Sequence, residues 1–536
     1  MLPIPTRSAA LVFIGCVATI CCGIAAASPT AVVFAGGCLL GLATALALTM
    51  PLGARLRRER LEFAWWHAHS TSAAGEHGVV VGAPIEVRCY VRNRGVRPLR
   101  MLDLAPSVPQ GVEVIGPERA ELRMAPRSRA EFSFRVRALA AGRVVLQGLA
   151  VSVPGPFGLF IAPLYFPSPL AIKVLPRAAA RALPPSTTTG GQSVERVGVT
   201  PLRRPGAGTD LHEIRELRPG DPFKSIAWKP SARAGRLMVR EVEREVQETI
   251  YLILDISGSM RGGAPGDRKL DHCIEMVSVA AREALERGDR VGLITVDGRV
   301  ATHVAASEGL QHMTRIYRAL LESTDVVDSD LTEVDDEDVV ELVGRYLKRQ
   351  HGLDLSRDGT FELSALVQHA ERALQADRDE GEVVAGSPQH ATLRRFCRKR
   401  GIPLPYRAET RAFAKAEGLA RALQTAAGNT RAPRTILLLS DFDGVFDPAP
   451  LLKTLALLRA RRHLLSCVFP DARSLTPPAA SGLRNDLHRV YSLQESRRLA
   501  EVRALFGRLG VPVVAYGARD DKLDTIRRAQ TARRVA

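Results

Sequence analysis

The sequence predicts an α/β protein on a membrane anchor: an N-terminal helical hairpin, a small β-sandwich and a larger domain built on a mainly parallel sheet. Residues 8–50 contain no charged side chain, residues 82–176 form short alternating segments, and beyond residue 249 apolar strands alternate with helical patterns. The chain has 536 residues, enough for several domains, and its hydrophobic fraction of 46% excludes general disorder.

The apolar tract is expected to be a transmembrane hairpin over residues 1–52. It divides into Ala9–Ala27 and Ala31–Met50, each close to the roughly twenty residues that span a bilayer. Pro29 stands in the polar break between them, where a tight turn would lie. The basic cluster Arg55–Arg60 follows, and such clusters stay on the cytoplasmic side. We therefore expect both ends of the hairpin, and the soluble domains, to face the cytoplasm.

A cleaved signal peptide is the alternative interpretation of this tract, with Ala25–Ser28 as a small-residue cleavage site. Cleavage there would leave one span and turn the soluble part outward. The second apolar span and the basic cluster behind it favour the hairpin.

The cysteines predict neither a disulfide framework nor a zinc site. They show no CxxC spacing and no His-rich partner segment, so buried reduced thiols are expected. Four lie in the apolar spans and four are scattered over the soluble part: Cys16, Cys21, Cys22, Cys38, Cys89, Cys273, Cys397 and Cys467.

The soluble part divides by composition. Turn formers separate short strands in the sandwich, and a Pro/Thr/Gly-rich stretch over Pro184–Gly191 opens a polar-aromatic connection. The last domain contains a region without strand–helix rhythm, which is expected to be an insertion. The predicted segments after the hairpin are a juxtamembrane linker (53–81), the β-sandwich (82–176), a linker (177–245), and the α/β domain (246–536) with its insertion near 350–410.

Oxygen-bearing side chains follow two of the apolar strands. One strand runs into Asp255, Ser257 and Ser259, and the other, over 435–440, ends at Asp441. Ligands of open α/β sheets bind at the carboxyl ends of the strands. Carboxylates and hydroxyls on adjacent strand ends suit Mg²⁺ or another small divalent cation that keeps an open position.

The Asp255–Ser259 motif resembles the metal-ion-dependent adhesion site of von Willebrand factor type A domains, whose fold is a Rossmann-like doubly wound sheet. In that family a threonine from a middle loop and an aspartate after the fourth strand complete the site. Asp441 matches the aspartate, and Thr332 matches the threonine, with Thr360 as the alternative. The resemblance implies a metal held by Asp255, Ser257, Ser259, Thr332 and Asp441, with one position left for a partner's carboxylate.

A second resemblance covers nearly the whole chain. The segments Arg218–Asp221, Ile226–Arg233 and Leu237–Glu241, with the turn Pro156–Phe160, are similar to bacterial proteins classed as domain of unknown function 58. It implies an inner-membrane protein that partners a MoxR-type AAA+ ATPase in chaperone-like assembly or maturation of a client protein. The role implied is metal-dependent protein binding, not enzymatic activity.

A phosphatase is the alternative function. An apolar strand into Asp441 and Asp443, followed by Gly444, resembles the nucleophile motif of haloacid-dehalogenase-type phosphatases, and Gly517–Asp521 resembles their distal acidic motif. That fold begins with its nucleophile strand, whereas several strands come earlier here. The motif at Asp255 would also be left unexplained.

The net charge of +17 needs a location before it indicates a partner. The Arg-rich tail carries no DNA- or RNA-binding motif, so no nucleic acid is expected. Part of the charge lies in the cluster Arg55–Arg60, and the rest is dispersed over Arg-rich helices. An anionic membrane face is the neighbour that this distribution favours.

Overall fold

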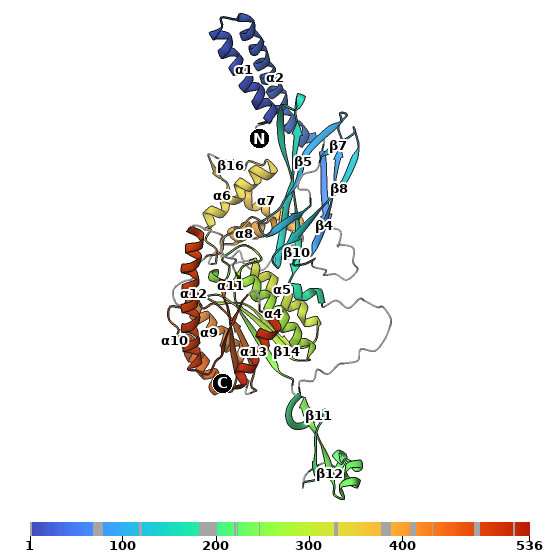
Figure 1. Cartoon of the computed structure of the whole chain (residues 1–536), viewed down its shortest axis with the longest axis vertical. Coiled ribbons are helices and arrows are strands. Elements are labelled where there is room, and N and C mark those ends of the chain that lie inside the picture. Colours follow the sequence, from blue (N-terminus) through green and yellow to red (C-terminus); the bar gives the residue numbers. More distant parts are fainter. Residues whose placement is uncertain are drawn as a thin grey trace. The chain divides into compact units, whose positions relative to one another are not determined.

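We describe the protein from a computed structural model (Figure 1). It forms two compact units: residues Met1–Leu175 with Asp325–Arg407, and residues Pro176–Thr324 with Ala408–Ala536. The structure describes residues 3–535 apart from 60, 68–78, 117–120, 182–200, 219–220, 222, 246, 326–330, 358, 377–386, 408–413, 431, 476–482 and 518–519.

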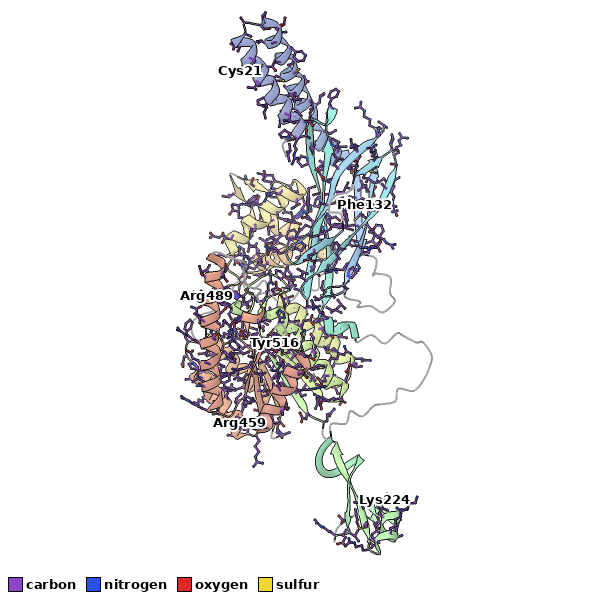
Figure 2. The ribbon with its side chains drawn as sticks, in the orientation of Figure 1. Cys21, Phe132, Lys224, Arg459, Arg489 and Tyr516 are labelled. Carbon is purple, nitrogen blue, oxygen red and sulfur yellow. The ribbon has the colours of Figure 1, made fainter. Side chains whose placement is uncertain are left out.

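Two apolar helices begin the first unit. Helix α1 (Arg7–Ala25) has the Thr6 hydroxyl as its N-cap, and helix α2 (Pro29–Glu59) follows after a short turn. Arg7–Ala25 and Pro29–Leu52 are long and apolar enough to cross a membrane, as the sequence predicts. Cys21, labelled in Figure 2, lies on α1.

Two antiparallel sheets occupy the region predicted to be a sandwich. Their edge-to-edge orders are β1-β10-β9-β5-β7, with β3 added in parallel to β10, and β2-β4-β8-β6. The strands are β1 (Ile4–Pro5), β2 (Leu61–His67), β3 (Val79–Val80), β4 (Pro84–Asn93), β5 (Leu99–Ser107), β6 (Val112–Ile115), β7 (Leu122–Met124), β8 (Arg129–Ala138), β9 (Gly142–Pro154) and β10 (Phe160–Leu175).

Strand β2 lies where the sequence analysis places a linker. Its side chains alternate, and Phe63 and Trp65 point toward the other sheet. The Phe63 ring lies 6.0 Å from the Phe166 ring, and the Trp65 indole N–H donates to the Ser168 carbonyl at 2.6 Å. Aromatic burial between the sheets therefore makes this segment a strand of the domain.

A helical segment, Asp325–Arg407, belongs to the first unit. Its described elements are α6 (Asp336–Tyr346), a π-helical turn (Leu347–His351), β16 (Ser356–Arg357), β17 (Thr360–Phe361), α7 (Leu363–Ala376) and α8 (Pro388–Arg400). Val343, Leu366 and Phe396 lie in its apolar core. The insertion predicted near 350–410 thus begins earlier in the structure, because α6 buries its apolar face against α7 and α8.

The second unit is built on one mixed sheet of order β15-β14-β13-β18-β19-β20. All neighbouring strands are parallel except β15, which is antiparallel to β14. The chain winds outward from β13 in both directions, so the order reverses between β13 and β18. The strands are β13 (Thr249–Asp255), β14 (Arg290–Val296), β15 (Val300–Ser307), β18 (Thr435–Leu439), β19 (Leu464–Pro470) and β20 (Val513–Tyr516).

Helices cover both faces of this sheet, which explains why its central strands are apolar throughout. One face packs against α9, α10 and α12, whose side chains join Tyr251 and Ile253 in a single core. The helices on that face are α9 (Ala414–Ala427), α10 (Ala449–Ala460) and α12 (Leu483–Gly507), and those on the other are α4 (Lys269–Glu286), α5 (Gln311–Thr324) and α13 (Lys522–Val535).

The predicted linker over 177–245 contains a two-stranded ribbon of β11 (Pro201–Glu216) and β12 (Met238–Glu245), with the short helix α3 (Trp228–Ala234) between them. Lys224, labelled in Figure 2, precedes α3. The Pro184–Gly191 stretch lies outside the described residues. All eight cysteines are free, and burial raises the pKa of Cys89 to about 12.

Candidate binding site at the strand ends

The candidate site lies where the strand order of the second unit reverses. Asp255 ends β13, and Asp441 follows β18 after Ser440. The two strands are paired in parallel through Leu254 and Leu439, so both carboxylates leave the same edge of the sheet. The reversal of strand order opens the crevice in which doubly wound sheets bind ligands.

Asp255 is fully buried. Its Oδ1 accepts the backbone N–H of Ser257 at 3.0 Å, which fixes the turn after the strand. Its Oδ2 accepts the Ser440 hydroxyl at 2.5 Å and contacts Lys415 Nζ at 2.8 Å. The Ser257 and Ser259 hydroxyl oxygens lie 3.2 Å apart on the same turn.

Asp441 is equally buried and joins the two loops. Its Oδ1 accepts the Ser259 hydroxyl and the backbone N–H of Asp443, both at 3.0 Å. The same oxygen contacts Lys415 Nζ at 3.0 Å, and Oδ2 contacts Lys269 Nζ at 2.9 Å. The structure thus brings together four of the five predicted metal ligands: Asp255, Ser257, Ser259 and Asp441.

Lys415 lies at the centre of this arrangement. It comes from the first turn of α9, and its side chain is 1% exposed. Its ammonium donates to Asp255 Oδ2 at 2.8 Å, Asp441 Oδ1 at 3.0 Å and Ser259 Oγ at 3.1 Å. A positive charge therefore lies between the two carboxylates, bound to oxygens from both strand ends.

Further charged groups extend from Asp441 toward α12. Lys269, the first residue of α4, also contacts Glu495 Oε1 at 3.2 Å. Arg498 holds that same oxygen at 2.7 Å and reaches Asp443 Oδ1 at 2.7 Å. Each buried carboxylate of the site therefore has a cationic neighbour, as burial of charge requires.

The cations and anions shift each other's pKa values in the direction of their charged forms. Burial would raise the pKa of Asp441, but Lys415 and Lys269 hold it well below its ordinary range. Burial would likewise lower the pKa of Lys415, and the Asp255 and Asp441 carboxylates raise it instead. The pKa of Glu495 is raised by burial, which Lys269 and Arg498 oppose. Lys415 is therefore an ammonium at neutral pH and not a nucleophilic amine.

The fit of a divalent cation depends on Lys415. The oxygens of Asp255, Ser259 and Asp441 are the right chemistry for Mg²⁺, which binds such oxygens at about 2.0–2.1 Å. The Lys415 ammonium contacts one oxygen of each of these residues, so a metal could use them only after Lys415 had moved away. Within the part of the chain that the structure describes, no group of three or more His, Cys, Asp or Glu is placed to hold a metal ion.

The threonines expected to complete the site belong to the first unit. Thr332 is buried, and its hydroxyl accepts the Arg394 guanidinium at 2.7 Å. Thr360 lies in β17, exposed, with its hydroxyl donating to the Arg357 carbonyl at 3.2 Å. The part of either threonine in a metal site stays a prediction.

Sequence reasoning missed the cations of the site. Lys415 and Lys269 each stand in the first turn of an amphipathic helix, where a lysine is ordinarily solvated. Glu495 and Arg498 come from α12, far along the chain. The available signal was electrostatic: two carboxylates predicted at adjacent buried strand ends require compensating charge from somewhere in the fold.

The residues of the phosphatase alternative are also on this edge. Asp443 is 40% exposed and paired with Arg498, while both oxygens of Asp441 are engaged by lysines. Within the Gly517–Asp521 motif, the Asp520 carboxylate accepts the Gly517 backbone N–H at 2.8 Å and so closes its own turn. Residues 518–519 lie outside the described part.

Comparison with known proteins identifies a family region. Residues 213–353 match the family described as protein of unknown function DUF58. This segment of the chain is similar to the DUF58 family. The predicted resemblance is thereby confirmed for a segment that includes the end of β11, β12, β13 and the Asp255–Ser259 motif. In this DUF58 region Ala227 and Val239 are buried, while Trp228 is 66% exposed.

Two relatives of this chain are themselves uncharacterized. An uncharacterized protein of Mycobacterium tuberculosis, Rv1480, is 27% identical over 116 residues, covering 22% of this chain and 37% of its own length. YeaD of Bacillus subtilis, also uncharacterized, is 31% identical over 110 residues, covering 20% and 25%. The chain thus spans only 37% and 25% of the lengths of these two relatives. The structure of a FixG-related protein from Vibrio parahaemolyticus aligns over 22% of this chain and 97% of its own length, at 12% identity. The TM-score of this alignment is 0.15, too low to indicate a shared fold.

Proposed function

We propose that this chain is a membrane-anchored protein-binding module that works with a MoxR-type AAA+ ATPase in the assembly or maturation of a client protein. The observation that carries the proposal is the position of the Asp255 and Asp441 loops at the reversal point of the sheet. Buried side chains hydrogen-bond the two loops to each other, and Phe446, in the loop after Asp441, is 73% exposed. Exposed aromatic side chains of this kind are typical of binding surfaces.

The strand order and the Asp255–Ser259 loop support a von Willebrand A type domain as the binding domain. The two apolar helices and the basic residues behind them support an anchor in the bacterial inner membrane, with the soluble parts in the cytoplasm. The ATPase would supply the energy, and this chain would hold the client or the ATPase near the membrane.

No bond is broken in this function. Asp255 and Asp441 hold the two loops against each other through Ser257, Ser259 and Lys415. A divalent cation such as Mg²⁺, if it displaced Lys415, would let a partner's carboxylate complete the coordination shell. In the arrangement that the structure has, the residues themselves position the loops, and the partner meets their outer surface.

A retention experiment tests this function. The full chain, immobilised in detergent, should retain a MoxR-type ATPase encoded in the same genome. Phe446→Ala should weaken retention by roughly tenfold or more, since exposed aromatic anchors dominate interfaces. Leu457→Ala is the matched control, because Leu457 is an exposed apolar residue on α10. Equal retention by both variants would refute the strand-end surface, and no retention by the unmodified chain would refute the partner.

The alternative function as a phosphatase can be tested directly. Release of phosphate from p-nitrophenyl phosphate, lost on Asp443→Asn, would replace the binding function by catalysis. If the pure chain releases no phosphate with excess Mg²⁺, the phosphatase function is refuted and binding remains the function of the strand-end residues.

A further inference from the structure

We infer that the Lys415 ammonium is the resident cation of the strand-end site and that the site operates without a divalent ion. The role of Lys415 is argued from its contacts and does not depend on a partner. Only the consequence for partner binding rests on the proposed function. A metal-free site of this kind recognises its partner through loop surfaces and hydroxyls, because no open coordination position exists for a carboxylate.

The hydrogen-bonding capacity of Lys415 is fully used. An ammonium has three N–H donors and no acceptor. The three oxygens around Nζ belong to Asp255, Ser259 and Asp441, at 2.8, 3.1 and 3.0 Å. These oxygens come from both loops, so one side-chain amine links the two strand ends as a bridging metal would.

The three buried carboxylates of the site, on Asp255, Asp441 and Glu495, are matched by the cations of Lys415, Lys269 and Arg498, and the more exposed Asp443 also pairs with Arg498. Lys415 and Lys269 contribute two positive charges against the two carboxylates of Asp255 and Asp441. Arg498 contacts Glu495, the other acidic neighbour of Lys269. A divalent ion added to this set would put two surplus positive charges in a buried region, which is costly unless a lysine leaves.

Manganese binding to the full chain in detergent tests the inference, with free Mn²⁺ followed by electron paramagnetic resonance. The unmodified chain should bind no Mn²⁺ above the level of the Asp255→Asn variant. Lys415→Ala removes the ammonium and leaves its oxygens, so it should bind Mn²⁺ roughly tenfold or more tightly than the unmodified chain. Lys453→Ala, on α10, is the matched control and should behave as the unmodified chain does.

The opposite pattern overturns the inference: tight Mn²⁺ binding by the unmodified chain, lost in Asp255→Asn and unchanged in Lys415→Ala. If Lys415→Ala folds poorly, its refolding yield is measured with and without Mn²⁺. A yield that Mn²⁺ restores supports the inference, and a yield that Mn²⁺ does not change contradicts it. Retention of the ATPase in EDTA is a separate readout. Loss of retention in every buffer refutes the proposed function and leaves the manganese result standing.

A different observation carries a second inference, which rests on the helical hairpin being the membrane anchor. The turn between β9 and β10 is apolar, and no charged residue occurs between Arg143 and Lys173. At its tip Phe157 is 93% exposed with a positive φ of 58°. A bulky residue in the left-handed region is strained, and such strained residues cluster at functional sites.

This turn is fixed to the helices of the hairpin. Phe160 packs in a buried cluster with Ala9 of α1 and Leu42 and Ala45 of α2. Thr6 donates its hydroxyl to the carbonyl of Leu159 at 2.9 Å. The tip is therefore held alongside the apolar spans themselves.

The position of the contact between this turn and helix α2, close to the end of the apolar span, places the tip of the turn at the bilayer surface. Gly155 lies so close to Thr49 that an added Cβ would be 2.2 Å from its Oγ1. Thr49 precedes the end of the apolar span at Leu52, about 4.5 Å along the helix at 1.5 Å per residue. We propose that Phe157 inserts into the lipid interface beside the hairpin, where aromatic rings are favoured.

Quenching of tryptophan fluorescence by brominated lipid tests this contact. In liposomes, Phe157→Trp should add emission that brominated lipid quenches and acrylamide does not. Val96→Trp, at an exposed turn of the same unit, is the control and should show the reverse. Added emission from Phe157→Trp that acrylamide quenches as fully as that of Val96→Trp would refute the insertion.

Discussion

Two buried cations, one in each unit, show how differently the same charge is used. Arg394, in the helical segment of the first unit, is fully buried and contacts Asp336, the Thr332 hydroxyl and the Val334 carbonyl. Its carboxylate partner is 35% exposed. Lys415, in the second unit, bridges two carboxylates that are themselves buried. Arg394, among neutral acceptors and a partly solvated carboxylate, stabilises its local fold. Lys415, between two buried carboxylates, takes the position that a bound metal ion would occupy.

The largest effect should follow from removing the bridging cation. Lys415→Met leaves Asp255 and Asp441 facing each other in the interior, and breaking a buried pair costs about 3–5 kcal/mol. Urea unfolding followed by hydrogen exchange of the second unit measures this loss. A change below about 1 kcal/mol, the size of a surface ion pair, would mean that Lys415 is not the compensating charge.

Arg394→Met should cost less and behave differently. It leaves the Thr332 hydroxyl and the Val334 carbonyl without this donor, at about 1–3 kcal/mol for a buried group. Since its carboxylate partner reaches solvent, Mn²⁺ should not restore the loss, unlike in Lys415→Ala. The comparison fails if Mn²⁺ stabilises Arg394→Met as much as it stabilises the lysine variant in matched urea titrations.

The pH dependence of the lysine variant sharpens the contrast. The pKa of Asp441 is lowered, so its contribution to stability is complete above the ordinary pKa of about 3.9 and is lost as pH falls below it. The pKa of Lys415 is raised, so its contribution is complete below about 10.4 and is lost as pH rises through the folded value. The difference in unfolding free energy between the unmodified chain and Lys415→Met should therefore be greatest between these limits. A constant difference in urea midpoint from acid to alkaline pH would contradict the ion pairing.

The smallest effect should come from the membrane-facing tip. Phe157→Ala removes a side chain that is 93% exposed, so folding stability should change by no more than about 0.5 kcal/mol. Thermal unfolding in detergent checks this. A larger loss would show that Phe157 packs within the protein and does not meet lipid.

The sequence predicted what local patterns determine. The hairpin followed from the absence of charge over residues 8–50, and the strands β13 and β18 from runs of apolar residues that end in Asp255 and Asp441. Parallel pairing then places both carboxylates on one edge, which pattern reasoning also supplies.

What the sequence did not predict depends on tertiary packing. Lys415 follows a segment with no regular pattern, and a single lysine in a helix carries no mark that its amine lies between two carboxylates. No local pattern shows that α6 packs against α7 and α8, so the inserted segment was given too late a start. Strand β2 was missed because its pairing with β4 is long-range.

A crystal structure of the soluble part of the second unit, grown with excess MnCl₂, tests the central claim most directly, or the full chain if that unit does not fold alone. The account predicts Lys415 Nζ between Asp255 and Asp441, with no anomalous peak for manganese between them. A manganese peak bound by these two carboxylates, with the Lys415 side chain turned away, would contradict it.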